Sequence, residues 1–222
     1  MARTKTARPR TTAPREARAE PKQARALQTR EMLLDVAGLL LAEVGIERIS
    51  TNLICQRAGV TPPALYRYFD DKFAIIEALG MRLMERQNAV LVDWIEQHVA
   101  HGVAAAAAAT EQLLRETAAV TRSEPGGVWI ERALHATPRL EHIRIESHRF
   151  VTERLTEALA PQLPDVPREA IWRRIRVAVE FGYVVDELLH SEADMPEDAL
   201  FAETSALLRA AFLSWTDPVA AD

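Results

Sequence analysis

The chain has 222 residues, which suffices for one or two domains with a sizeable core. Alanine, leucine, glutamate and arginine dominate and glycine is scarce, a mixture that favours helices. No apolar run approaches the about 20 residues that span a bilayer, and the start lacks the apolar core of a secretory signal. The single Cys55 excludes an internal disulfide framework and a multi-cysteine metal site, and it fits a reducing cytoplasm.

Basic residues are concentrated at the amino terminus. Residues 1–30 hold nine Lys or Arg and two Glu, a net charge of +7, so the remainder carries −12 within a total of −5. Such a body is repelled by polyanions, whereas the arm can present one local surface to nucleic acid. Because residues 1–27 are rich in Pro, Thr and charge, we predict a basic disordered arm there; a merely solvated tail is the alternative.

Two helices are predicted after the arm. Apolar residues recur at three- and four-residue spacing from residue 28 to Gly45, and glycine tolerates the positive φ of a helix C-terminus. Ser50 or Thr51 can cap a second, short helix, because their side-chain oxygens accept hydrogen bonds from the first turn. Gly59 ends this helix.

Two adjacent prolines follow a cap at Thr61, where a third helix through Phe69 is predicted. Proline has no backbone N–H and a fixed φ, so it is tolerated in the first turn of a helix, whose N–H groups lack intrahelical partners. Pro62 and Pro63 therefore stiffen the start of this helix. With the glycine-containing turn at residues 58–60 before it, the segment predicts a helix-turn-helix unit, whose second helix lies N-terminus first in the major groove of DNA.

The exposed face of the third helix suits DNA. Tyr66 and Tyr68 can direct hydroxyl groups at phosphates on either side of the groove, although half-buried packing is the alternative for both. Arg67 can reach a phosphate or a guanine edge, and Lys72 can hold a further phosphate. The two prolines and Ala64 present an apolar leading edge that suits thymine methyl groups.

Beyond residue 70 the helical segments lengthen. No strand alternation is long enough to predict a sheet, so the expected fold is all-α with about nine helices. The further helices are expected over residues 71–101, 104–122, 128–135, 137–159, 167–190 and 196–215.

Each of the last two helices carries an apolar stripe. Two such helices at a chain end can pack against the same pair in a second subunit and form an isologous four-helix interface. The alternative is that both stripes close the core of a single subunit. The predicted homodimer interface consists of Ile175, Val179, Gly182, Leu189, Leu208 and Phe212.

Several of these features occur together in one known pattern. They are the helix end at Gly45, the Ser50 cap, the Ala58-Gly59-Val60 turn, Leu65-Tyr66, Phe69 and Lys72. On these features the segment 39–79 resembles the DNA-binding domain of the TetR family of transcriptional repressors. The resemblance implies an all-helical homodimer that binds a palindromic operator. It further implies a three-helix DNA-binding domain over residues 28–78 and an effector-binding and dimerisation domain over residues 79–222.

The resemblance also assigns the DNA contacts. It places them at Thr61, Pro63, Tyr66, Tyr68 and Lys72, with a further contact at Asn52 on the second helix. Pro62 and Ala64 replace commonly polar base-contacting types, and Asp70-Asp71 places acid near Lys72, which should lower nonspecific affinity for DNA. The basic arm exceeds the family's typical short leader and can enter the minor groove or track phosphates.

An effector pocket is implied in the middle helices. Repressors of this family usually respond to a small molecule that shifts the spacing of the two DNA-binding heads. Aromatic lining with few polar groups suits an apolar or aromatic ligand, while plain core packing is the alternative for each residue. The candidate pocket residues are Trp94, Trp129, His135, His142, Phe150 and Tyr183.

The sequence does not indicate an enzyme. No nucleophile elbow, phosphate loop or dinucleotide fingerprint is present, and no cofactor is expected. His142 and Glu146 share a helical face, but without a third ligand they predict no metal site. The chain is therefore predicted to be a cytoplasmic, sequence-specific, DNA-binding transcriptional regulator, namely a repressor released by a small-molecule effector. The alternatives are a nucleoid or scaffold protein that binds DNA without sequence preference through the basic arm, and an all-helical enzyme.

Overall fold

The computed structural model describes residues 20–192 and 194–216, so residues 1–19 of the predicted arm over residues 1–27 lie outside the described part. Within that part all regular structure is helical, which confirms the all-α prediction. None of its helices combines the length and the apolar character needed to cross a bilayer. The elements are α1 (Glu20–Arg48), α2 (Thr51–Ala58), α3 (Pro62–Leu65), α4 (Lys72–His98), η2 (Val99–His101), α5 (Val103–Ala108), α6 (Thr110–Ser123), α7 (Gly127–Ala136), α8 (Glu141–Leu159), η3 (Ala160–Gln162), α9 (Arg168–Ser191) and α10 (Glu197–Leu213).

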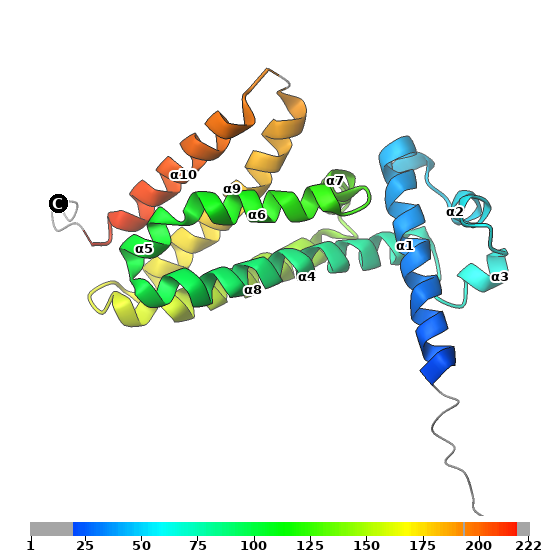
Figure 1. The fold of residues 1–222 in the computed structure, drawn as a ribbon, viewed down its shortest axis with the longest axis horizontal. Coiled ribbons are helices and arrows are strands. Elements are labelled where there is room, and N and C mark those ends of the chain that lie inside the picture. The colour runs from blue at the N-terminus through cyan, green and yellow to red at the C-terminus, as the bar shows by residue number, and fades with distance from the viewer. Residues whose placement is uncertain (1–19, 193, 217–222) are drawn as a thin grey trace, which may run out of the picture.

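The helices form two unequal parts that α4 joins (Figure 1). The small part consists of α1, α2 and α3, and α4 runs from it into a bundle with α5–α10. One core spans both parts, because Leu33 and Leu65 of the small part belong to the same buried cluster as Leu134 and Ile143 of α7 and α8. Two further clusters fill the larger part. The DNA-binding segment expected over residues 28–78 therefore shares its core with the rest of the chain.

The first helix begins earlier than predicted. The disordered arm is expected to reach residue 27, but α1 starts at Glu20, because residues 23–27 are good helix formers and continue its first turns. The Thr29 hydroxyl donates to the Arg25 carbonyl at 2.9 Å within this segment. At the other end Gly45 leaves the helical conformation, with φ 75° and ψ 169°, and a last turn continues to Arg48.

The structure contains ten α-helices in its described residues, where about nine are predicted. The additional helix arises because the segment expected as one helix over residues 104–122 is divided at Ala109, whose φ is −92° and ψ is 5°. The Ala109 carbonyl accepts a hydrogen bond from the Trp94 indole at 3.1 Å. This tertiary contact lies at the break, and an alanine-rich sequence gives no sign of it.

A buried carboxylate connects the two parts. Glu124, at the turn between α6 and α7, has a fully enclosed side chain that contacts Arg82 and lies 2.5 Å from Arg86. The Arg82 guanidinium also reaches Glu31 at 2.8 Å and Asp35 at 2.9 Å, both on α1. The hydrogen bond from Arg82 lowers the pKa of Glu31. This network therefore ties α1, α4 and the α6–α7 turn together.

Candidate nucleic-acid interface and ligand cavity

The helix α2 has the boundaries that its capping residues predict. Ser50 precedes it, and Ser50 Oγ accepts a hydrogen bond from the Leu53 N–H at 3.2 Å. Gly59 follows it in the left-handed conformation, with φ 67° and ψ 28°. The Val60 N–H donates to the Cys55 carbonyl at 3.1 Å, so the chain reverses within a short turn before α3.

The helix α3 is shorter than predicted. Pro62 and Pro63 occupy its first turn. Backbone N–H groups in a first turn have no acceptor within the helix, so the two prolines remove no helical hydrogen bond. The α-helix ends at Leu65 instead of continuing to Phe69, and residues 66–68 form turns. Leu65 and Phe69 are both buried in the first core, and this anchoring draws the chain inward after a single helical turn.

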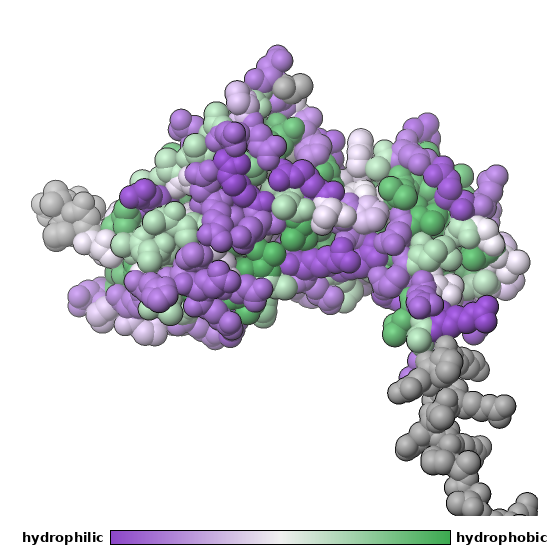
Figure 2. Space-filling view, in the orientation of Figure 1, coloured by the Kyte–Doolittle hydropathy of each residue, from purple (hydrophilic) through white to green (hydrophobic). Residues whose placement is uncertain are grey.

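The predicted DNA contacts lie mostly at the surface. Exposed residues are Thr61, Pro62, Pro63, Tyr66 and Arg67, with Asn52 on α2, whereas Ala64, Tyr68 and Lys72 are half-buried. Thr61 sits at the N-cap position of α3, but its hydroxyl makes no capping hydrogen bond. Figure 2 shows pale residues of intermediate hydropathy beside hydrophilic ones at this end of the molecule. We call this set, from α2 and residues 61–72, the tip surface.

Two contacts attach the tip surface to the rest of the small part. The Tyr66 hydroxyl lies 3.1 Å from Thr51 Oγ1, which joins α3 to α2. Lys72 Nζ donates to the Ile46 carbonyl at 3.0 Å and lies 5.4 Å from the centroid of the Phe73 ring. The ammonium carries three N–H donors, so a phosphate can share it with the Ile46 carbonyl.

The acidic residue next to Lys72 has a structural role. Asp71 caps α4, since Asp71 Oδ1 accepts a hydrogen bond from the Ala74 N–H at 2.7 Å. Its other oxygen lies 3.1 Å from the Arg139 guanidinium. The Ala74 N–H lowers the pKa of Asp71, and Arg139 adds to that effect. Both oxygens of the Asp71 carboxylate are therefore paired with groups of this chain, which limits the repulsion between Asp71 and DNA.

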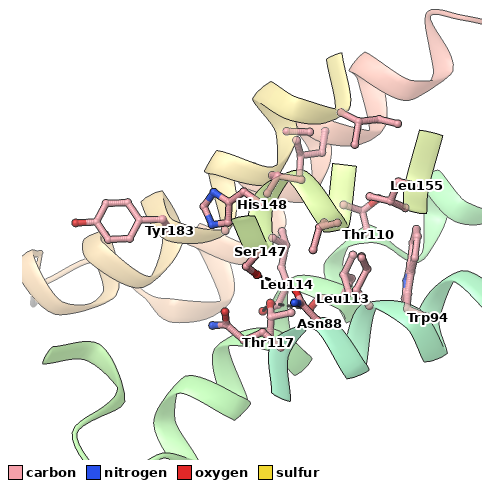
Figure 3. A pocket seen from close by; sticks show the side chains of 18 of the residues that line it. Asn88, Trp94, Thr110, Leu113, Leu114, Thr117, Ser147, His148, Leu155 and Tyr183 are labelled. Atoms are coloured by element: carbon pink, nitrogen blue, oxygen red, sulfur yellow. Dashed lines mark hydrogen bonds between the residues drawn. The ribbon is translucent and has the colours of Figure 1, made fainter. Parts of the chain in front are cut away.

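The larger part contains a cavity of about 150 Å³ that residues of α4 to α10 line. Figure 3 shows Trp94 and Leu155 at one end of it and His148 and Tyr183 at the other, with Asn88 between them. The end at Trp94 is mainly apolar, and the hydroxyl of Thr110 at this end donates to the Ala106 and Ala107 carbonyls. The end at Tyr183 gathers most of the polar side chains of the lining.

Hydrogen bonds and an ion pair organise this polar end. Ser147 Oγ donates to Asn88 Oδ1 at 3.0 Å. His148 Nδ1 donates to the Glu180 carboxylate at 3.1 Å, and the Arg144 guanidinium lies 3.4 Å from the same carboxylate. Burial lowers the pKa of His148, so its ring is uncharged at neutral pH.

His135 and Tyr183 form a stacked pair at the polar end. Their ring centroids lie 3.5 Å apart with an interplanar angle of 16°. His135 Nδ1 donates to the Glu131 carbonyl at 3.0 Å. Burial lowers the pKa of His135 and raises that of Tyr183, so both rings are uncharged at neutral pH.

Comparison with known proteins identifies the family. Residues 33–79 match the family model of bacterial regulatory proteins of the tetR family, and residues 104–213 match that of the tetracyclin repressor-like C-terminal domain. Together these two matches cover more than half of the chain. The chain belongs to the TetR family. It is a DNA-binding transcriptional regulator with a helix-turn-helix head.

Individual relatives agree with this family membership. The chain is 25% identical to the HTH-type transcriptional regulator UidR of Escherichia coli strain K12 over 179 residues, 79% of this chain and 88% of UidR. It is 34% identical to the class D tetracycline repressor of Escherichia coli over 59 residues, a segment that spans only 27% of that repressor. A solved TetR-family regulator from Streptomyces coelicolor is 27% identical, with a TM-score of 0.60 over 85% of this chain and 97% of that one.

Half of the predicted pocket residues of this TetR-family chain line the cavity. Trp94, His135 and Tyr183 do, whereas Trp129, His142 and Phe150 lie outside it and are exposed. Trp129 packs under the Arg132 guanidinium at 5.2 Å, on the outer side of α7. On α8 the lining residues recur at the spacing of one helical face, which turns Phe150 outward; they are Arg144, Ser147, His148, Val151, Leu155 and Leu159.

The predicted dimer stripe of the TetR-family regulator is largely the wall of its own cavity. The cavity is lined by Ile175, Val179, Gly182, Leu208 and Phe212. Ile175 is 0% exposed and Leu208 is 7% exposed, so both side chains are packed inside their own subunit. Leu189 packs against the third cluster of its own subunit. Helical spacing marks these residues as buried, but it does not say what buries them.

Proposed function

We propose that this regulator is a repressor that binds a palindromic operator as a homodimer and leaves the operator when a small molecule occupies the cavity. The observation that supports it most directly is the course of α4. Lys72, its first residue, holds the Ile46 carbonyl beside the tip surface, and Asn88 and Trp94 of the same helix line the cavity. A ligand that tilts α4 therefore acts on the DNA-binding head.

The tip surface is the proposed DNA-binding site of each subunit. One tip enters a major groove of each half-site, and the two half-sites lie about 34–36 Å apart or a multiple of that distance. Arg67 is exposed and is suited to a phosphate or a guanine edge, whereas the hydroxyls of Tyr66 and Tyr68 are suited to phosphates. The proposed contacts are Asn52, Thr61, Pro62, Pro63, Ala64, Tyr66, Arg67, Tyr68 and Lys72.

The proposed dimer interface uses the outward side of α9 and α10. Val177 and Val184 of α9 are 62% and 45% exposed and lie seven positions apart, on one face of the helix. Leu207 of α10 is 62% exposed. The two helices pack against each other, so a second copy that covers both would remove these apolar side chains from water in a four-helix interface.

Release by an effector is a shift between conformers. A ligand that binds better to the conformer with the wrong spacing of the two heads lowers operator affinity by that difference in binding free energy. Two routes connect the cavity to the head, α4 itself and the Glu124 network with Arg82 and α1. Both start in elements that line the cavity.

Selection of bound fragments from a genomic library would define the operator. Fluorescence anisotropy would then compare the affinity of the protein for the operator with its affinity for random duplex DNA at the same salt concentration. We expect Arg67→Ala to weaken operator binding about 5- to 100-fold, as for loss of a base or phosphate contact. Arg154→Ala is the matched control, because Arg154 is an exposed arginine of α8, far along the chain from the tip surface. Equal affinity of the wild type for operator and random duplex would contradict the proposal and favour backbone-only binding.

A further inference from the structure

Two buried polar atoms in the wall of the cavity lack a hydrogen-bond partner. His135 Nε2 and Arg144 Nε are both enclosed, and neither atom makes a hydrogen bond to any group in residues 20–192 or 194–216. Both side chains line the cavity. A buried donor or acceptor without a hydrogen bond is unfavourable, so a ligand group that completes these bonds gains affinity there.

The two atoms need partners of opposite kind. His135 Nδ1 donates to the Glu131 carbonyl, so Nε2 of the neutral ring is an acceptor. Burial, and then the charge of Arg144, lowers the pKa of His135 and keeps the ring neutral. Arg144 Nε carries a hydrogen and is a donor. A hydroxyl group both donates and accepts, so it is a neutral group that can pair with either atom.

The charges at this end do not favour an anionic ligand. Among the described residues that line the cavity, Arg144 is the only arginine or lysine. Its guanidinium already lies 3.4 Å from the Glu180 carboxylate and 3.6 Å from the Glu141 carboxylate. A ligand carboxylate could accept from Arg144 Nε, but it would leave His135 Nε2 facing negative charge.

The opposite end accepts an apolar group. Trp94 and Leu155 are buried there, and the Trp94 indole N–H is already bonded to the Ala109 carbonyl. The whole cavity measures about 150 Å³. An apolar cavity of about this volume in another protein core holds a single benzene ring.

We propose that the cavity binds a small neutral ligand with an apolar body and one hydroxyl group. The hydroxyl donates to His135 Nε2, and the apolar body extends toward Trp94 and Leu155. The proposal rests on the proposed function in that it takes this cavity as the effector site.

Three probes of similar shape test the ligand class on the full chain. They are 4-ethylphenol, which carries a neutral hydroxyl, ethylbenzene, which carries no polar group, and 4-ethylbenzoate, which is an anion. Isothermal titration calorimetry at neutral pH should give 4-ethylphenol a Kd about 10-fold below those of the other two probes. 4-Ethylphenol should bind without proton uptake. Equal heats of binding in buffers of different ionisation enthalpy would show this. Equal Kd values for 4-ethylphenol and ethylbenzene, or tighter binding of 4-ethylbenzoate, would overturn the proposal.

A pair of histidine variants locates the hydroxyl. His135→Phe keeps a ring of similar size against Tyr183 and removes the acceptor, so 4-ethylphenol should fall to the affinity of ethylbenzene while ethylbenzene is unaffected. His142→Phe is the control, because His142 is exposed and outside the cavity, and it should change neither Kd. If His135→Phe melts like the wild type and keeps the preference for 4-ethylphenol, the assigned hydroxyl position is wrong.

Operator binding separates this proposal from the proposed function. If none of the three probes binds while the operator is still recognised, the ligand class is wrong and the repressor assignment stands. If 4-ethylphenol binds as expected but leaves operator affinity unchanged, the ligand class is right and release by this cavity is wrong.

Discussion

Gly38 of α1 lies so close to the Pro125 carbonyl that a Cβ on Gly38 would come within 2.1 Å of that oxygen. Gly126 completes the contact from the other side, since its own Cβ would lie 2.1 Å from the Gly38 carbonyl oxygen. The first helix of the DNA-binding head therefore rests on the α6–α7 turn, backbone against backbone. Because α6 and α7 line the cavity, this contact joins the head to two of the helices that surround the cavity.

A methyl group at this contact should destabilise the fold. We expect Gly38→Ala to lower the free energy of unfolding by about 1–3 kcal/mol, because the added group meets backbone that cannot rotate away. Gly182→Ala is the matched control, since a Cβ there meets no atom within 4 Å. It should leave stability unchanged or raise it by about 0.5–1 kcal/mol, as expected for alanine in a helix. Urea unfolding of both variants checks this, and equal effects would contradict it.

Neutralising the buried carboxylate at the same turn should also be costly. Glu124→Gln removes the charge that Arg82 and Arg86 share, and we expect a loss of about 1–3 kcal/mol in the free energy of unfolding. Glu43→Gln breaks an exposed pair with Arg57 at 2.7 Å and should change stability little. Denaturant midpoints of the two variants compare them directly. A Glu124→Gln midpoint no lower than that of Glu43→Gln would show that the network does not hold the two parts together.

The stability of the fold should decrease as the pH is lowered through the range in which His148 titrates. Burial holds the pKa of His148 below its ordinary 6.5, so the unfolded chain takes up a proton at pH values where the folded chain does not. The stabilisation is therefore complete above pH 6.5 and is lost as the pH falls from 6.5 toward the folded pKa. His148→Gln should reduce this slope, whereas His101→Gln, at an exposed site, should preserve it. Denaturant midpoints on both sides of pH 6.5 measure the slopes, and identical slopes in all three proteins would refute the assignment.

The Tyr66 hydroxyl is expected to bind a DNA phosphate, and not only to hold α3 against α2. Tyr66→Phe should weaken binding to every duplex about 3- to 10-fold, because one phosphate hydrogen bond is lost. Thr51→Val removes the same hydrogen bond between α2 and α3 but leaves the Tyr66 hydroxyl available to DNA. It should therefore bind DNA nearly as well as the wild type. Equal losses in the two variants, measured by anisotropy, would mean that the hydroxyl acts only by bracing α3.

A charge on the outward side of α10 should separate the subunits. Leu207→Asp places a carboxylate where the proposed interface buries an apolar side chain, so we expect sedimentation to show a monomer at concentrations where the wild type is a dimer. Leu39→Asp is the control, because Leu39 of α1 is also exposed, at 50%, but lies in the head. A Leu207→Asp protein that sediments like the wild type would place the interface elsewhere.

The local features of the head follow directly from the sequence. The Ser50 cap, the left-handed Gly59 and the break at Gly45 are predicted correctly, because each depends on the conformational limits of one residue and its immediate neighbours. The two prolines start α3 for the same reason. Much of the tip surface is predictable too, since Leu65 and Phe69 are the buried apolar residues of this segment and the side chains between and before them are left at the surface.

The long-range contacts could not be predicted in this way. Lys72 holds a carbonyl 26 positions earlier in the chain, and Gly38 meets a turn more than 80 residues away. Periodicity identified the apolar stripe of α9 and α10 but could not say whether a partner subunit or a cavity faces it. Ile175 and Leu208 belong to the cavity wall, while Val177 and Leu207 remain exposed.

The amino-acid sequence by itself determined the helical class, the caps and turns of the head, and most of the side chains that the tip surface exposes, because backbone preferences act over a few residues. Tertiary structure alone decided where the cavity lies, which polar atoms it leaves without a partner, and how the head is braced against it. Those properties depend on how distant helices fit together, and a hydrophobic pattern records only that a face avoids water.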